Sequence, residues 1–181
     1  MTHRELVPLL DCAVVRNHVE LTEMFLQNGA DVNVRIAYQA LERHNANVQA
    51  PMLLKHGANV WAKDKFGLNA LHYVAASSVE RSEMARLFIE KGISLDERGQ
   101  IRHNQPIHLA AERGRSELVN LFADHSADVN SRANEWPEDD TFPLYLAAAC
   151  RSPAAVEALL KRGANVNMKT KTGRTALHKA C

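Results

Sequence analysis

The sequence contains few cysteines and no pattern that would join them. Its three cysteines, Cys12, Cys150 and Cys181, are widely spaced, and no Cys-x-x-Cys pair occurs. This argues against a disulfide framework and against a cysteine-based zinc cluster. No Asn-x-Ser/Thr sequon occurs either. Both observations favour a reducing, intracellular compartment, and we expect the cytoplasm, with the nucleus as the alternative.

Signals for membrane insertion and secretion are also missing. The longest apolar stretches, such as 144–150 (LYLAAAC), are far too short to cross a bilayer. The first ten residues, MTHRELVPLL, lack the long apolar segment that a signal peptide needs. Thr2 stands where N-myristoylation requires a glycine. We therefore expect no membrane insertion.

Charge of one sign is not in excess. The chain has 22 basic and 21 acidic residues, which gives a formal net charge of +1. These residues are spread throughout, and no basic face or tail is evident. Binding to nucleic acid leaves an electrostatic footprint of clustered Lys and Arg, so nucleic acid is not an expected partner.

The motifs of common enzyme classes are absent as well. The sequence has no Gly-rich phosphate loop, no Gly-x-Ser-x-Gly and no His-Glu-x-x-His. The acidic segment 135–140 (EWPEDD) lacks the spacing and the glycine of a calcium loop, which favours a solvated loop. We expect no enzymatic activity, no cofactor and no metal site.

What the sequence does contain is internal repetition. The segment 81–88 (RSEMARLF) recurs 34 residues later as 115–122 (RSELVNLF), with five of eight positions identical. A finishing signature similar to Gly-Ala-Asp-Val-Asn recurs at spacings of 28, 35, 34 and 37 residues. Its five copies begin at Gly29, Gly57, Gly92, Ser126 and Gly163. A starting signature occurs at residues 7–13, 69–75, 105–111, 142–148 and 175–181. A period in this range is typical of a solenoid.

Each signature predicts a local structure. Pro8, Pro106 and Pro143 in the starting signature fit the first turn of a helix, where the missing N–H has no partner to lose. A second amphipathic helix follows, as in 152–163 (SPAAVEALLKRG), and the glycine after it suits the left-handed residue beyond a helix end. Ser126 replaces that glycine in one copy, so we expect a less stable helix end there. The unit is a helix, a turn, a helix and a short extended segment, which must stack on its neighbours to bury its apolar face.

Starts similar to Thr-Pro-Leu-His-x-Ala and finishes similar to Gly-Ala-Asp-Val-Asn resemble the ankyrin-repeat family over nearly the whole chain. The resemblance implies an all-α solenoid of stacked helix-turn-helix ankyrin repeats with short β-hairpin loops. We predict one array over residues 1–181. Its repeats are expected at 4–33, 36–62 (degenerate), 66–96, 102–132 and 139–168, with a partial repeat at 172–181. In the degenerate repeat Pro51 lies near the start of the second helix, so we expect that helix to be short.

The last ten residues, TGRTALHKAC, read as the first helix of a sixth repeat. Solenoids normally finish with a modified, polar capping repeat, whereas this start signature is unmodified. We interpret the sequence as a fragment of a longer array. We also expect Leu177 and Ala180 to pack on the fifth repeat and to remain partly uncovered.

Three histidines, His72, His108 and His178, occupy the same position in their repeats. A catalytic or metal-binding interpretation competes with a structural one, in which each imidazole ties its helix start to the neighbouring backbone, as the resemblance implies. Copies that lie one repeat apart are too far from each other to share a metal ion, whose ligands lie within about 2 Å. We favour the structural interpretation.

The resemblance implies that a partner would bind to the concave side, which the family builds from first helices and hairpin loops. The residue after the histidine position should point into this groove, which predicts an exposed apolar row of Tyr73, Leu109 and Leu146; packing against neighbouring helices is the alternative. Further candidates lie at the hairpin tips. They are Trp61, Lys63 and Phe66 in one loop, and Trp136 in the longer loop at 131–142, where packing on Pro137 is the alternative.

We therefore predict a monomeric, non-enzymatic protein-interaction module that binds a protein partner through its groove and hairpin tips. One alternative is the substrate-recognition or regulatory part of a larger enzyme assembly, such as an array with a C-terminal box that recruits a ubiquitin ligase, or one linked to a kinase or channel. Another alternative is that the array is the substrate of a modification. The resemblance implies that the Asn of the finishing Val-Asn can be hydroxylated, which maps to Asn33, Asn130 and Asn167. The sequence does not identify the partner.

Overall fold

The structure is a computed structural model that describes residues 3–16, 18–32, 46–78, 81–100, 102–135 and 139–181. It consists of two compact units, Met1–Asp64 and Lys65–Cys181. The single continuous array over residues 1–181 stays a prediction. None of the helices in the described part of the chain combines the length and the apolar composition that crossing a membrane requires.

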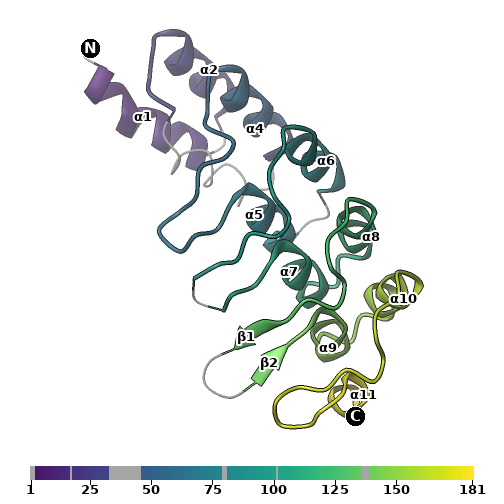
Figure 1. Cartoon of the computed structure of the whole chain (residues 1–181). Helices are drawn as coiled ribbons and strands as arrows, with labels where there is room; N and C mark the ends of the chain where they lie inside the picture. Colours follow the sequence, from purple (N-terminus) through teal and green to yellow (C-terminus); the bar gives the residue numbers. More distant parts are fainter. Residues whose placement is uncertain (1–2, 17, 33–45, 79–80, 101, 136–138) are drawn as a thin grey trace. The chain divides into compact units, whose positions relative to one another are not determined.

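The first unit contains three described helices around a small apolar core (Figure 1). They are α1 (His3–Val15), α2 (Val19–Gln27) and α4 (Ala46–Lys55). Leu10 and Val14 of α1 are fully buried, and they pack in one cluster with Leu26 of α2 and Leu53 of α4. This apolar cluster holds the three helices together, because each contributes an apolar stripe that has no other place to be buried.

Two prolines of this unit lie elsewhere in their helices than the sequence predicts. Pro8 is inside α1, which begins five residues earlier at His3, and Pro51 is inside the ten-residue α4. The expectations of a first-turn Pro8 and of a shortened second helix at Pro51 are therefore wrong. Both prolines are exposed, so their rings lie on the solvent side of the helix, and each costs its helix one backbone hydrogen bond.

The second unit alternates first and second helices of successive repeats. In Figure 1, α5, α7, α9 and α11 form one row, and α6, α8 and α10 form another beside it. Consecutive members of each row pack against one another. The helices are α5 (Ala70–Ala76), α6 (Ser82–Glu90), α7 (Pro106–Glu112), α8 (Ser116–Asp124), α9 (Pro143–Ala149), α10 (Pro153–Lys161) and α11 (Ala176–Ala180). The predicted helical solenoid is confirmed.

A single two-stranded hairpin accompanies these helices in the described part of the second unit. Strand β1 (Ala133–Glu135) pairs antiparallel with β2 (Asp139–Thr141), and Ala133 lies opposite Thr141. The hairpin leads directly into α9, whose cap residue Phe142 is buried. It is the form that the predicted hairpin loop takes in this repeat.

The helix starts of the second unit are fixed by the residues that the repeat pattern indicates. Pro106 and Pro143 occupy the first helical turn, as expected. Asn69 caps α5 by accepting the His72 N–H at 3.2 Å. Between the rows lies a core of large side chains with less than 2% exposure, among them Leu71, Ile107, Leu118, Phe122 and Leu159.

Two buried imidazoles connect each first helix with the loop that enters the next repeat. His72 Nδ1 accepts the Asn69 N–H at 3.2 Å, and its Nε2 lies 3.0 Å from the carbonyl oxygen of Asn104. His108 repeats the arrangement with Gln105 N–H at 3.2 Å and the Ser131 carbonyl at 3.1 Å. A backbone carbonyl oxygen can only accept, so the proton of each neutral ring is on Nε2, which donates to the carbonyl. The structural interpretation of these two histidines is confirmed.

Neutrality of the buried ring is favoured by its surroundings. The pKa of His108 is lowered to about 4, chiefly because burial would strip the charged form of its hydration, and the charge of Arg98 acts in the same direction. The hydrogen bond to Ser131 and the charge of Asp128 oppose this shift without cancelling it. His108 is therefore a neutral link between repeats near pH 7.

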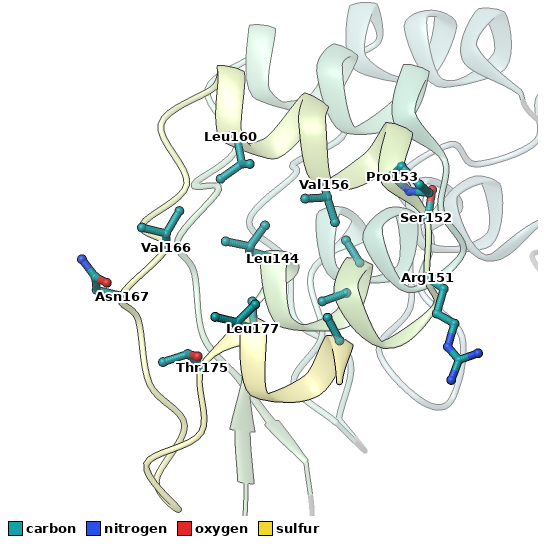
Figure 2. Close-up of a pocket in the computed structure, with 14 residues that line it drawn as sticks. Leu144, Arg151, Ser152, Pro153, Val156, Leu160, Val166, Asn167, Thr175 and Leu177 are labelled. Atoms are coloured by element: carbon teal, nitrogen blue, oxygen red, sulfur yellow. The ribbon is translucent and has the colours of Figure 1, made fainter.

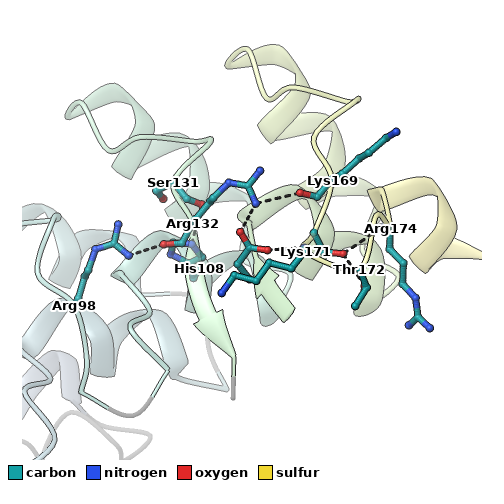
Figure 3. A network of polar contacts seen from close by, with 10 residues as sticks. Arg98, His108, Ser131, Arg132, Lys169, Lys171, Thr172 and Arg174 are labelled. Atoms are coloured by element: carbon teal, nitrogen blue, oxygen red, sulfur yellow. Dashed lines mark hydrogen bonds and ion pairs between the residues drawn. The ribbon is translucent and has the colours of Figure 1, made fainter. Parts of the chain in front are cut away.

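The loops are joined by a second set of polar contacts (Figure 3). Arg98 donates to the backbone carbonyl oxygen of Arg132. The Arg132 guanidinium forms an ion pair with Asp140 and donates to the Lys169 carbonyl at 3.1 Å. Asp140 Oδ1 also accepts the Lys171 N–H at 2.7 Å. These contacts connect the loops of three successive repeats, so the acidic segment contributes Asp140 to a structural ion pair.

Three non-glycine residues adopt a left-handed backbone where equivalent repeats have glycine. Ser126 has φ 70° at the position of Gly163, Arg151 has φ 54° at the position of Gly114, and His103 has φ 49°. A side chain costs about 1–2 kcal/mol in this conformation. The left-handed backbone expected at Ser126 is present, and the lower stability of this helix end stays a prediction.

Replacement of Ser126 with glycine is predicted to raise the free energy of unfolding by about 1 kcal/mol, because it removes the strain of the left-handed backbone. The converse replacement, Gly163→Ser, should lower it by about the same amount, since no atom lies within 4 Å of an added Cβ there. Urea unfolding followed by circular dichroism measures both. Equal stability of the two variants and the natural chain would contradict the strain.

Loss of stability at acidic pH is predicted to depend on His108. The pKa of His108 is about 4 in the folded chain and 6.5 in the unfolded chain. Between pH 4 and pH 6.5 the unfolded chain therefore binds this proton more tightly than the folded chain. The neutral ring of His108 therefore contributes fully to the free energy of unfolding above pH 6.5, and this contribution is lost as the pH falls toward 4. Between pH 7 and pH 5 the free energy of unfolding falls by about 2 kcal/mol. Urea unfolding at both pH values should show a correspondingly weaker pH dependence for His108→Gln. The matched control is His178→Gln, since His178 is exposed. An unchanged pH dependence in His108→Gln would show that His108 does not cause the loss of stability.

Candidate functional site

The candidate groove is a row of side chains one position after the histidine position of each first helix. Tyr73 lies on α5, Leu109 on α7, Leu146 on α9 and Lys179 on α11. The imidazole bonds of His72 and His108 fix the start of their helices against the next repeat. The following residue therefore recurs at the same place in each repeat, so a shared surface can form.

The exposure of this row differs from the prediction at one position. Tyr73 and Leu109 are half-buried, and Lys179 is exposed, but Leu146 is only 6% exposed. The expectation of an exposed Leu146 is wrong. Helix α9 lies between α7 and α11 and packs against both, which is the alternative that the sequence left open. The Lys179 ammonium of α11 lies 5.6 Å from the centroid of the ring of Tyr145, the residue before Leu146. The long aliphatic part of a lysine covers apolar surface while its charge stays in water.

A shallow pocket of about 300 Å³ opens at this end of the row. It is lined by Glu112, Tyr145, Leu146, Ala149, Cys150 and Lys179. Its lining includes the Tyr145 ring with the Lys179 ammonium 5.6 Å from the ring centroid, and Glu112, which is 3.5 Å from Arg102. The pocket could therefore hold an apolar side chain beside a carboxylate or a carbonyl. Tyr145 and Glu112 are not among the residues predicted from the sequence, although Tyr145 stands at the position of the repeated histidine.

The predicted hairpin-tip residues belong to different units. Trp61 of the first unit is 63% exposed, and its backbone N–H donates to Asn59 Oδ1 at 3.0 Å. Lys63, two residues later, is exposed as well. Phe66 of the second unit is 38% exposed, with the Lys65 ammonium 4.8 Å from its ring centroid. Their joint role in binding stays a prediction. Trp136 lies outside the described residues.

The asparagines considered for hydroxylation have different environments. Asn130 connects two repeats, because its Nδ2 donates to the Gly163 carbonyl at 3.2 Å and its Oδ1 accepts the Asn165 N–H at 2.8 Å. Asn167 is exposed, and Asn33 lies outside the described residues. Modification of these side chains stays a prediction. No group of three or more His, Cys, Asp or Glu that could hold a metal ion occurs among the residues that the structure describes.

Comparison with protein-family models agrees with this architecture over almost all of the chain. A model described as ankyrin repeats (3 copies) matches residues 37–133, and one described as ankyrin repeats (many copies) matches residues 132–180. A model of the single ankyrin repeat matches residues 6–36. None of these three models describes a catalytic family.

Similar proteins carry the same repeats within longer chains. Alpha-latrotoxin-Lt1a of Latrodectus tredecimguttatus is 31% identical over 86% of this chain and 11% of the toxin. Ankyrin repeat and SOCS box protein 16 of Homo sapiens is 27% identical over 95% of this chain and 39% of that protein. Ankyrin repeat and SOCS box protein 6 of Mus musculus is 32% identical over 60% of this chain and 25% of that protein. The chain thus spans less than half of the length of each of these relatives.

The helix-turn-helix units, the imidazole links between them and the matches of three family models lead to one conclusion. The chain belongs to the ankyrin-repeat family.

Proposed function

We propose that this chain binds a protein partner non-covalently along the row of first helices, with the hairpin tips as flanking contacts. The observation that carries the proposal is the register of Tyr73 and Leu109, which are apolar, half-buried and placed on adjacent helices. The row continues into the pocket between Tyr145 and Lys179. Ankyrin repeats are protein-interaction modules. In the second unit the row of first helices presents side chains at equivalent positions of successive repeats.

The surface is suited to recognition because it is fixed before a partner arrives. The imidazole links and the Arg132–Asp140 ion pair hold the helices and loops of adjacent repeats together. Little conformational freedom is then lost on binding, which leaves more of the contact energy for affinity. A tyrosine in such a row is a typical hot-spot residue, since it buries a large ring and has few rotamers to lose.

A second candidate function is substrate recognition within a larger assembly. Two relatives are named ankyrin repeat and SOCS box proteins, and this chain spans 39% and 25% of their lengths. A repeat array of this kind would supply the binding surface, and a box elsewhere in the polypeptide would recruit a ubiquitin ligase. Sequencing the complete transcript tests this proposal: a coding region without any further domain would remove its support.

Simultaneous replacement of Tyr73 and Leu109 with alanine is predicted to reduce partner recovery at least about tenfold, because both apolar contacts of the row are lost. The measurement is affinity capture from cells with the full chain as bait, quantified by mass spectrometry against the natural sequence. Arg86→Ala is the matched control, since Arg86 lies on α6 in the second-helix row and is exposed.

The circular dichroism spectrum and the unfolding midpoint of the double variant establish that it is folded. Unchanged capture by a folded Tyr73→Ala/Leu109→Ala variant would mean that the first-helix row is not the binding surface. Loss of capture in Arg86→Ala as well would mean that the effect does not come from the row.

A further inference from the structure

An apolar concavity of about 650 Å³ lies between α9, α10 and α11 (Figure 2). Leu177 and Ala180 line it; Leu177 is 73% exposed and Ala180 is exposed as well. This confirms the expectation that α11 packs on α9 while both side chains stay partly uncovered. In a longer array a second helix of the sixth repeat would pack here, as α10 packs on α8. The exposure of this face is therefore no evidence of a partner.

The shallow pocket of about 300 Å³ lies within the first-helix row instead. Its lining comes from α7, α9 and α11 and from Cys150, which directly follows α9. Helix α9 has a first helix packed on each side, as α7 has. Ala149 stands where α7 has Glu112, and its small side chain leaves room beside Leu146. The pocket is thus a feature of the row itself.

Tyr145, which lines this pocket, departs from the repeat pattern. At the same position His72 and His108 bond to a carbonyl oxygen of the next loop, at 3.0 and 3.1 Å. The hydroxyl of Tyr145 makes no hydrogen bond with any residue that the structure describes, although the residue is only 5% exposed. A largely buried hydroxyl without a partner costs stability. The phenol is therefore a donor that the described fold does not use.

The unpaired charge of the pocket is positive. The Lys179 ammonium lies 5.6 Å from the centroid of the Tyr145 ring and forms no ion pair with a carboxylate in the described part of the chain. Glu112, the acidic residue of the lining, already has a cation, since it is 3.5 Å from Arg102. A ligand that balances the remaining charge is an anion.

The wider surroundings of Lys179 carry charge of the same sign. Residues 151–181 contain seven Lys or Arg and one acidic residue, whereas residues 1–150 contain 15 basic and 20 acidic residues. The expectation that charge is spread throughout, without a basic tail, is wrong for this last segment. Such a segment attracts anionic groups over a longer range and disfavours cationic ones.

We propose that this pocket binds the side chain of a glutamate of the protein partner. The carboxylate would pair with the Lys179 ammonium and accept a hydrogen bond from the Tyr145 hydroxyl. The methylene groups would lie on Leu146 and Ala149. A side chain suits the site because a segment that lies along the row reaches the pocket with its side chains. The inference rests on the proposed function and adds to it the chemical class of one partner residue.

The test titrates the complete 181-residue chain, labelled with ¹⁵N, with three small compounds. N-acetylglutamate α-methylamide carries a side-chain carboxylate, and N-acetylglutamine α-methylamide is its neutral counterpart. N-acetylglutamine carries a terminal carboxylate instead. We expect the glutamate compound to shift the amide signals of Leu146, Ala149 and Cys150. It should bind at least about fivefold more tightly than the other two compounds, and added salt should weaken its binding.

Two variants locate the carboxylate. Lys179→Gln should weaken binding of the glutamate compound at least about fivefold, because the ion pair is lost. Tyr145→Phe should weaken it about two- to threefold without lowering the unfolding midpoint, because the hydroxyl has no partner in the described fold. Lys171→Gln is the matched control, since Lys171 is an exposed lysine of the same basic segment that does not line the pocket.

The same variants are then compared by affinity capture from cells. Lys179→Gln should recover at least about threefold less partner, and Lys171→Gln should recover as much as the natural chain. The proposal is overturned if the pocket signals do not shift, or if either glutamine compound binds as tightly as the glutamate compound. Unchanged binding by Lys179→Gln or by Tyr145→Phe, or unchanged capture by Lys179→Gln, overturns it as well.

The outcome also separates this inference from the proposed function. If Tyr73→Ala/Leu109→Ala loses capture while the glutamate compound does not bind, the first-helix row stands and the pocket has no role. If the double variant captures normally while Lys179→Gln loses both binding and capture, the pocket stands without the row.

Discussion

The second unit depends on a hydrogen bond from an imidazole Nε2–H to a backbone carbonyl of the loop that enters the next repeat. His72 makes this bond to Asn104, and His108 makes it to Ser131. The opposite ring nitrogen accepts a backbone N–H at the start of the same helix. One buried side chain therefore fixes a helix start, a loop and the distance between two repeats. Apolar packing alone is non-directional and would tolerate small shifts between stacked helices.

This link also determines where the side chains that follow each imidazole lie. Side chains that follow the imidazole are presented at a constant repeat distance, and Tyr73 and Leu109 thereby form part of one row. The loops of successive repeats are connected as well, because Arg132 and Asp140 pair with each other and bond to the backbone of residues 169–171. The last described first helix, α11, has the same cap, since Thr175 N–H bonds to His178 Nδ1 at 3.3 Å. There the apolar side chain of Leu177 is exposed.

The sequence predicts most of this architecture because the information is local and repeated. Capping residues, first-turn prolines and terminal glycines act within one helix, so Pro106, Asn69 and Gly163 could be interpreted directly. The repeat period then predicts the stacking. The prediction failed at Pro8 and Pro51, where the helices extend farther toward the N-terminus than the start signature indicates.

The surfaces were harder to predict than the fold. Leu146 is buried although the repeat pattern places it in one row with the half-buried Tyr73 and Leu109, so position within the repeat alone does not determine exposure. The role of Asp140 required two loops to meet that are about 30 residues apart in the chain. By contrast, the charge difference between residues 1–150 and 151–181 could have been counted from the sequence, and the total charge of +1 concealed it.

The most direct test of the imidazole link is ¹⁵N NMR of the histidine side chains at pH 7. The account predicts that the rings of His72 and His108 are both neutral Nε2–H tautomers, with slow exchange of that proton because it is donated to a buried carbonyl. A predominant Nδ1–H tautomer, or rapid exchange of the Nε2 proton at both rings, would contradict it. The links between repeats would then rest on packing alone.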